Sequence, residues 1–322
     1  MRTSPKATCT APGRRFTLGA FTVALLALAP GAVLAAPRVV VTVKPLHSLV
    51  AGVMAGVGEP ELIIRGAGSP HTYSLKPSDA RLLEGAQVIF WVGESLETFM
   101  EKPLAALGSQ ALIVEALRLP GIALLAGREG GAWDAHEGHG AHEASGGVPE
   151  TRDGHLWLDP DNARVIARET ARMLGRLDPD HRGRYAANAA AVVARVDALD
   201  SELRLRLVPV RAAPFIVFHD AYQYFERHYG LRAVGSVAVG AERAPGARRV
   251  QEIRETIRGR GARCVFSEPQ FSPALIGTLL EGTSARTGTL DPLGAAVPAG
   301  PDAYFILMKA LGSSLADCLQ QR

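Results

Sequence analysis

The sequence lacks two motifs that would assign it to common classes of enzyme. It contains no His-Glu-x-x-His pattern of the kind that zinc peptidases carry on a helix. It also has no Gly-rich loop ending in Gly-Lys-Ser/Thr, so the chain is not predicted to be an ATPase. With 322 residues, of which 47% are apolar and 21% charged, the chain can still bury a large core, and we expect two domains.

A long apolar run of the kind that anchors a protein in a membrane is also missing. The first 35 residues instead resemble a secretory signal peptide, in which Arg14 and Arg15 precede an apolar run and Val33 to Ala35 supply a cleavage site. The run, Phe16 to Ala29, is shorter than the ~20 residues that span a bilayer. No lipid-acceptor cysteine follows the cut, so we expect a soluble periplasmic product. The paired arginines leave the general secretory and twin-arginine export routes open.

An excess of positive charge is absent once this leader is removed. The whole chain has 35 basic and 32 acidic residues, and four basic but no acidic residues lie in the leader, which leaves 31 basic and 32 acidic residues. Without a basic excess to neutralise phosphates, no nucleic-acid partner is predicted.

Cysteine is scarce, and its positions are informative. Cys9 lies in the leader, which leaves Cys264 and Cys318 as the only pair in a protein bound for an oxidising compartment. We expect the two to form a disulfide, which would disfavour the unfolded chain by about 4 kcal/mol in the loop-entropy description. The alternative is a pair of buried thiols that are not bonded.

Short apolar runs alternate with helical patterns in the rest of the chain, which predicts an α/β fold with mainly parallel sheets covered by helices. The predicted strands span 38–43, 61–65, 87–92 and 111–114 in the first half, and 214–218, 232–237, 263–267 and 286–290 in the second. A helical pattern at 77–85 separates two of them. We therefore expect two similar lobes, at 36–177 and 209–322.

One long helix is predicted to connect the lobes, over residues 178–208. From Pro179 to Leu207 the only internal Gly or Pro is Gly183, near the start, so the segment can form a rod of roughly 40 Å. Apolar residues recur along it at three- and four-residue intervals, namely Val192, Val193, Val196, Leu199, Leu203 and Leu207. This stripe could pack across both lobes, and a rigid connector would limit their closure.

Residues 127–154 are rich in Gly, Glu and His and have almost no large aliphatic side chains, so we expect a mobile surface loop. Its histidines, His136, His139 and His142, suit auxiliary metal capture of low affinity, because ordering the loop would cost entropy. A solvated linker would have the same composition. Three other histidines, His47, His181 and His228, fall in helical patterns and are interpreted as structural or solvent-facing.

Four side chains that could bind a metal ion lie where a predicted strand gives way to a loop, which is where open α/β sheets bind ligands. They are His71 in GAGSPHTYSLKPSD, His155 at the start of HLWLDP, His219 after the strand PFIVF, and Asp291 in LDPLG. Three neutral imidazoles and one carboxylate from both halves would meet in the cleft between the lobes. Imidazole nitrogens suit zinc, whereas manganese prefers more oxygen ligands, so Zn²⁺ is predicted.

Each of these positions also has a plainer interpretation. His71 could be a surface loop histidine, His219 a hydrogen-bonded core histidine, and Asp291 a turn residue before Pro292. Asp159 before Pro160 is expected to cap a helix. Asp220 could orient His219, but a helix cap is the favoured role.

The combined segments carry a family resemblance. GAGSPHTYSLKPSD resembles the first metal-histidine segment of the cluster A-I solute-binding proteins. HLWLDP and VFHDAYQYFERHYGL are similar to the second and third ligand segments of their zinc-specific, ZnuA-type members, and CVFSEPQF and GTLDPLG match the same group. The resemblance covers nearly all of the chain after the leader.

This resemblance implies two α/β lobes joined by one long helix, with Zn²⁺ held between them as the transported ligand by His71, His155 and His219. Asp291 matches the carboxylate that binds metal in manganese-type relatives, and either Asp291 or a water would take the fourth place. The implied partner is a membrane permease paired with an ATPase, and an auxiliary periplasmic zinc chaperone would be a further one. We expect a monomer without catalytic activity.

Two other functions stay open at this point. Three histidines and a water also form catalytic zinc sites, although a carboxylate or an enclosed fourth position would leave no activated water for a zinc hydrolase. A manganese or iron carrier, or an adhesin, on the same scaffold would differ mainly in its ligands, and a carboxylate in place of His219 would have indicated it.

Overall fold

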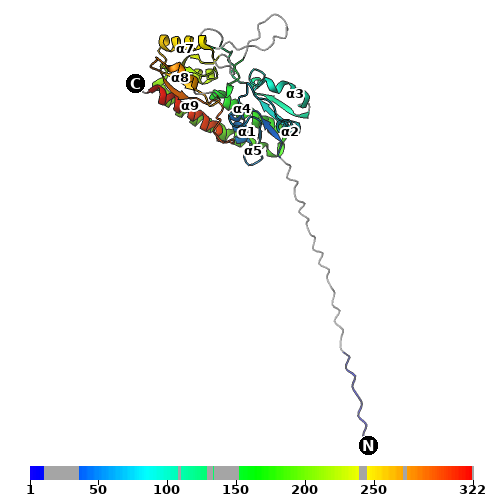
Figure 1. Cartoon of the computed structure of the whole chain (residues 1–322). Helices are drawn as coiled ribbons and strands as arrows, with labels where there is room; N and C mark the ends of the chain where they lie inside the picture. The colour runs from blue at the N-terminus through cyan, green and yellow to red at the C-terminus, as the bar shows by residue number, and fades with distance from the viewer. Residues whose placement is uncertain are drawn as a thin grey trace. The chain divides into compact units, whose positions relative to one another are not determined.

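The computed structural model describes residues 1–10, 36–107, 110–128, 133, 152–238, 245–270 and 274–320. The chain divides into two units, Met1–Ala35 and Ala36–Arg322. Residues 1–10 form no helix or strand, and the apolar run of the predicted leader lies outside the described residues. All regular structure of the described chain belongs to the second unit (Figure 1).

Two parallel four-stranded sheets form the framework of this unit. The first has the order β2-β1-β3-β4 and the second β6-β5-β7-β8, so both have the same topology. The strands are β1 (Val39–Val41), β2 (Glu61–Leu62), β3 (Val88–Trp91), β4 (Leu112–Glu115), β5 (Pro214–Val217), β6 (Arg232–Ser236), β7 (Cys264–Ser267) and β8 (Arg286–Thr289). All eight predicted strands are confirmed.

Strand β2 is shorter than predicted, because it ends at Leu62 rather than at residue 65. Its backbone still follows the sheet a little further, because the N–H groups of Ile63 and Ile64 donate to the carbonyls of Val41 and Thr42 at 2.9 Å each. The chain then turns away at Gly66, whose φ of +66° lies in the left-handed region that favours glycine. The strand is therefore short because the chain leaves the sheet edge early, toward the segment that carries His71.

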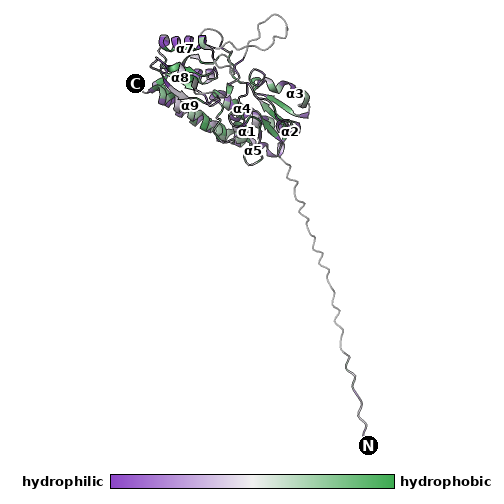
Figure 2. Cartoon of the chain, viewed as in Figure 1, coloured by the Kyte–Doolittle hydropathy of each residue, from purple (hydrophilic) through white to green (hydrophobic). Residues whose placement is uncertain are grey.

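Helices cover the sheets. They are α1 (Lys44–Met54), α2 (Pro77–Gly85), α3 (Glu101–Leu107), α4 (Pro160–Leu177), α5 (Arg182–Leu207), α6 (Gln223–Tyr229), α7 (Ala247–Arg260), α8 (Ala274–Leu280) and α9 (Ala303–Gln320). Short 3-10 turns span Thr98–Met100, Ala116–Arg118, Leu156–Leu158, Pro179–His181 and Val208–Val210. Figure 2 shows apolar strands and a polar α7, as expected when a sheet is covered and the covering helix faces water. Among the described residues, no helix combines the length and apolar character needed to cross a bilayer.

The predicted long helix is confirmed as α5, whose 26 residues span roughly 39 Å. Its apolar stripe is buried at Val192, Val196, Leu199, Leu203 and Leu207, whereas Val193 is only partly buried. The helix packs against α1 and α4, which precede it in the sequence, and against α9 at the C-terminal end of the chain. One hydrophobic core consequently runs through both halves, and a second, smaller one lies under α7 and α8.

Polar contacts also join the halves. Lys44, at the start of α1, donates from Nζ to the carbonyls of Ala295 at 3.1 Å and Val297 at 2.8 Å. Trp157 donates from Nε1 to the carbonyl of Pro292 at 2.9 Å. The lobe boundaries predicted at residues 177 and 208 stay predictions, because Ala36–Arg322 forms one unit.

The predicted disulfide is confirmed between Cys264 on β7 and Cys318 on α9, with a Cα–Cα distance of 6.3 Å. It ties the C-terminal helix to a central strand of the second sheet. Both cysteines are buried, so the bond lies inside the protein rather than at its surface.

We predict that replacing both cysteines by alanine lowers the free energy of unfolding by about 4 kcal/mol, because the bond closes a loop of 54 residues in the unfolded chain. Urea unfolding of the oxidised protein and of the double variant measures the difference. A reductant should weaken the wild type and leave the variant unchanged; equal midpoints for the oxidised wild type and the variant would contradict the prediction.

His228 on α6 is neither exposed nor isolated, so of its two predicted roles only the structural one is observed. Its Nδ1 lies 3.0 Å from Asp159 Oδ1 at the start of α4, and its Nε2 lies 2.9 Å from Asp200 Oδ1 on α5. Asp159 also caps α4 through the N–H of Asp161, as predicted. Burial lowers the pKa of His228, but the hydrogen bonds to the two carboxylates outweigh it and hold the pKa above its usual value.

The raised pKa gives this contact a pH dependence. Its contribution to stability is full below the unfolded pKa of about 6.5 and is lost as the pH rises through the higher folded pKa. We therefore expect the free energy of unfolding of the wild type to exceed that of His228→Gln by the largest amount at acidic pH. This difference in unfolding free energy should become smaller above neutral pH. Urea titrations of both proteins across this range test it, and a gap that is constant or widens with pH would be the contrary result.

Candidate metal centre

His71 lies on the loop between β2 and α2, after the turn at Gly66. Pro70 precedes it, and its backbone N–H donates to Ser69 Oγ at 3.3 Å. The side chain is only partly exposed. The irregular backbone expected from the glycines and the proline thus directs this imidazole inward rather than to solvent.

His155 immediately precedes the turn at Leu156–Leu158 and is 4% exposed. Its Nδ1 lies 2.8 Å from Asp153 Oδ1, which also accepts the backbone N–H of His155 at 2.9 Å. Gly154 between them is required by close packing, because a Cβ there would lie 2.7 Å from Leu96 Cβ. The three buried residues that follow form the apolar platform predicted behind this histidine.

His219 follows β5 and is 7% exposed. Its Nδ1 lies 2.7 Å from Glu268 Oε2, just beyond the end of β7. Since β5 and β7 are neighbours in a parallel sheet, the residues after them emerge at the same edge. The strand pairing therefore brings together two residues that are 49 positions apart.

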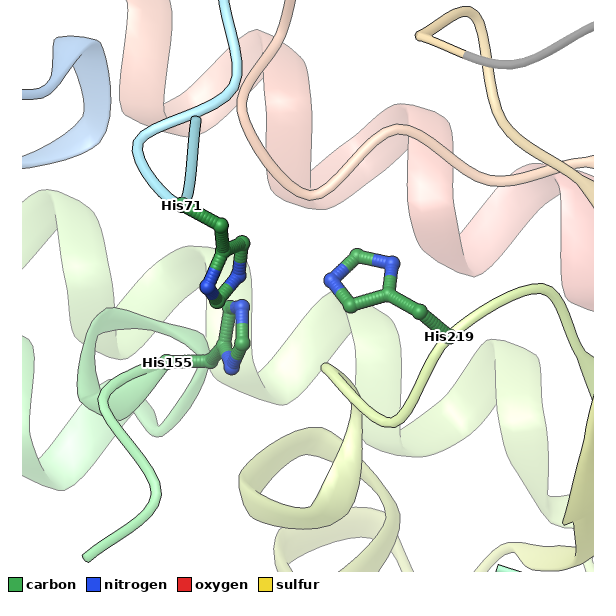
Figure 3. Close-up of side chains that lie close together, drawn as sticks. All are labelled: His71, His155 and His219. Atoms are coloured by element: carbon green, nitrogen blue, oxygen red, sulfur yellow. The ribbon is translucent and has the colours of Figure 1, made fainter. Parts of the chain in front are cut away.

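The three imidazoles converge. Their ring centroids are 5.4 Å apart for His71 and His155, 5.7 Å for His71 and His219, and 5.3 Å for His155 and His219. One ring nitrogen from each lies within 4.8 Å of those of the other two. Figure 3 shows the rings directed at one another from three separate loops.

The histidines border a small cavity of about 10 Å³, which has room for about one water. Its other lining residues are Ser69, Pro70, Glu268, Gln270, Pro292 and Leu293. A buried cavity of this size, with three imidazoles on one side, matches a single small cation better than an organic ligand.

Asp291, the fourth predicted ligand, is not part of this group within the described chain. Its Oδ1 accepts the N–H groups of Leu293 at 3.1 Å and Gly294 at 2.9 Å, and its Oδ2 accepts that of Ala295 at 2.5 Å. Gln270 donates to it as well, at 3.2 Å. The carboxylate thus organises the turn after β8, as in the plainer interpretation, and its role toward a metal stays a prediction.

The interpretation of Asp220 as a helix cap is wrong. Helix α6 begins at Gln223 and has Tyr222 at its N-cap, without a side-chain cap. Arg128 instead donates from Nε to Asp220 Oδ1 at 3.0 Å and Oδ2 at 2.9 Å, and from Nη2 to Oδ1. Arg128 also pairs with Glu226 at 2.9 Å, so the Asp220 carboxylate is part of an ion-pair network rather than a helix cap.

Two buried carboxylates, Asp153 and Glu268, were missed as functional residues by the sequence analysis. Glu268 stands in the SEPQ segment directly after a strand, the same position that pointed to the histidines, and this signal could have found it. Asp153 precedes His155 by two residues, a spacing typical of side-chain hydrogen bonds to a nearby backbone N–H.

A buried tyrosine lies behind one of the histidines. Tyr222 is buried and donates from its hydroxyl to Glu268 Oε1 at 3.1 Å. Burial and the neighbouring Glu268 carboxylate raise the pKa of Tyr222 well above its usual value, so it stays a donor.

The loop histidines His136, His139 and His142, which were predicted to assist metal capture, lie outside the described residues.

A second His–Asp group among the described residues consists of His228, Asp159 and Asp161. There both ring nitrogens face carboxylates, and Asp161 also pairs with Arg164 at 2.7 Å. This group is an ion-pair network rather than a set of metal ligands, because its carboxylates already pair with His228 and Arg164.

Comparison with known proteins agrees with this geometry. The sequence profile of the ZnuA family, described as "Zinc-uptake complex component A periplasmic", matches residues 39–318. The high-affinity zinc uptake system protein ZnuA of Brucella suis biovar 1 is 48% identical over 307 residues, which cover 88% of this chain and 92% of the relative. These matches extend over both sheets and all three histidines.

Solved structures agree as well. A crystal structure of ZnuA is similar with a TM-score of 0.75 and 26% identity, covering 88% of this chain and 99% of the other. A zinc-bound ZnuA from which residues 138–173, in its own numbering, are deleted has a TM-score of 0.72 and 25% identity, with coverage of 89% and 99%. With the family profile spanning most of the sequence and a relative at 48% identity, the chain belongs to the ZnuA family of periplasmic zinc-uptake components.

Proposed function

We propose that His71, His155 and His219 hold the Zn²⁺ that this chain binds as cargo. The chain is a periplasmic zinc-binding protein of a high-affinity uptake system that delivers Zn²⁺ to an ABC importer. The observation that supports the site is the meeting of one ring nitrogen from each histidine within 4.8 Å, from three loops in both halves. A small movement of the side chains would place all three nitrogens ~2.0–2.1 Å from one shared Zn²⁺ ion, the usual distance between zinc and an imidazole nitrogen.

The ligand chemistry favours zinc over manganese. All three side chains in the group are imidazoles, which suit Zn²⁺, whereas the carboxylates nearby hydrogen-bond to histidines or to backbone N–H groups. A manganese or iron carrier on this scaffold would need oxygen ligands facing the ion. The family consists of solute-binding proteins rather than enzymes, and we propose no catalytic activity.

Location and partners follow from the family and from the leader. We propose that residues 1–35 are a cleavable export signal, and that the two lobes, 36–177 and 209–322, dock as a monomer on a membrane permease served by an ATPase. An auxiliary periplasmic zinc chaperone would be a further partner. The loop histidines His136, His139 and His142 would assist capture, with His71, His155 and His219 as the high-affinity site.

We predict that His71→Ala, His155→Ala and His219→Ala each weaken zinc binding on the order of a hundredfold. Structural zinc sites with four ligands contribute about 10–16 kcal/mol, or roughly 3 kcal/mol for each ligand. Chelator-competition titrations of the metal-free proteins measure the change. Unchanged zinc affinity in all three variants would remove the proposed site.

His181→Ala is the matched control, because this histidine bonds to Asp178 at 2.8 Å on the turn before α5 and belongs to neither His group. It should bind zinc as the wild type does. Manganese titrations of the same set show whether selectivity depends on the imidazoles, since manganese binding stronger than zinc binding would support the rival carrier.

The Asp291→Asn variant tests whether Asp291 or a water molecule is the fourth ligand of the zinc ion. Because the Asp291 oxygens already accept three backbone N–H groups, we expect a water to complete the site and the variant to lose less than about tenfold in zinc affinity, below the cost of losing a ligand. The same titration gives the answer. A loss as large as that of a histidine variant would instead make Asp291 the fourth ligand.

A further inference from the structure

The proposed zinc ligands do not stand alone, since a buried carboxylate lies behind each of two histidines. Asp153 contacts His155 and Glu268 contacts His219, in both cases through Nδ1. The first contact is local, because Asp153 is two residues from its histidine. The second joins segments 49 residues apart, so it constrains the tertiary structure around the site.

Glu268 is held firmly. Its side chain is 1% exposed, and its two oxygens lie 2.7 and 2.8 Å from His219 Nδ1. Oε1 also accepts the hydroxyl of Tyr222 at 3.1 Å and the backbone N–H of His219 at 3.4 Å. A carboxylate with this many contacts cannot turn away without leaving several buried donors behind.

We propose that Glu268 is the positioning residue of the zinc site, acting through His219. Resting on the proposed zinc function, this assigns Glu268 the task of fixing the ring rather than of touching the ion. A carboxylate at Nδ1 selects the ring form with its proton on Nδ1, and so leaves Nε2 as the metal-binding nitrogen. Figure 3 shows a nitrogen of His219 directed at the other two rings.

The alternative, that Glu268 is itself a ligand, fits the contacts less well. Its oxygens lie 2.7 and 2.8 Å from His219 Nδ1, and among the described residues Glu268 does not belong to the group of ligand atoms that lie within 4.8 Å of one another. Tyr222 stands just before α6, and Tyr224 on that helix accepts the N–H of Leu125 and donates to the carbonyl of Asp153, each at 3.0 Å. The start of α6 thus contacts the Glu268 carboxylate and the backbone of Asp153, behind both histidines.

Three substitutions separate geometry from charge. Glu268→Ala removes the contact, Glu268→Asp keeps the charge but is one methylene too short to reach Nδ1, and Glu268→Gln keeps an oxygen acceptor at full length. If Glu268 positions the His219 ring, the Glu268→Ala and Glu268→Asp variants should bind zinc about 10–100-fold more weakly than the wild type. Gln should lose less than about tenfold, because a neutral hydrogen bond keeps roughly half the strength of a charge-assisted one.

The experiment uses the full mature chain, with chelator competition for Zn²⁺ and visible absorption of the Co²⁺-loaded protein. In the Ala and Asp variants the Co²⁺ bands should shift, because the His219 ring is no longer held in place, whereas the Gln variant should keep the wild-type spectrum.

Glu97→Gln is the control. Glu97 is a buried carboxyl group that accepts the backbone N–H of Val92 near β3, and burial raises its pKa to about 7. This variant therefore tests for a general effect of altering a buried carboxyl group and should match wild type in both measurements.

Three results would overturn the inference. Zinc affinity lost as fully in Gln as in Ala would mean that charge rather than geometry matters. Wild-type affinity and spectra in all three Glu268 variants, alongside weak binding by His219→Ala, would reject the positioning role and leave the proposed function intact. Zinc affinity of His219→Ala equal to that of the wild type would instead remove His219 from the proposed ligands, and the inference with it.

Discussion

Helix α5 is the element on which the arrangement of the site depends. His71 belongs to the first half of the chain and His219 to the second, so their separation is set by whatever holds the two sheets together. The buried stripe of α5 packs against α1 and α9, one helix from each half, in a single core. Because protein interiors are close-packed, a helix seated in this way resists sliding and bending. Three imidazoles can therefore stay close together before an ion arrives.

Contacts across the halves strengthen this constraint. Lys44 is buried, and burial lowers its pKa, although the nearby Asp291 carboxylate opposes the effect. Its ammonium group needs the carbonyls of the 294–297 turn, since an unpaired buried charge would cost several kcal/mol. Trp157, two residues after His155, reaches the neighbouring Pro292 carbonyl. A large opening of the halves would break both contacts, which agrees with the limited closure expected of a rigid connector.

Much of the fold was readable from the sequence, because parallel strands buried on both faces appear as short apolar runs. Two of the candidate histidines could be found for a related reason, since His219 directly follows such a run and His155 directly precedes Leu156–Leu158. His71 was indicated by the Gly and Pro residues of its loop. The disulfide followed from counting cysteines. In contrast, the partner of His219 depends on strand order: Glu268 lies next to it because β5 pairs with β7 on one side, as well as with β6, the next strand in the sequence, on the other. A single sequence does not show that pairing, so the neighbouring Asp220 was considered instead.

The placement of carboxylates behind the histidines explains how one site can satisfy two demands. A Zn²⁺ ion held by three neutral imidazoles would bury two positive charges, whose desolvation costs several kcal/mol for each ion unless opposite charge is close. Asp153 and Glu268 supply two negative charges at hydrogen-bond distance from the rings. Had these carboxylates faced the ion directly, the charge would balance equally well, but the ligand set would then suit manganese. With the carboxylates behind the rings, the atoms that face the proposed ion would remain nitrogens, which favour zinc, while opposite charge lies close enough to lower the cost of burying the ion.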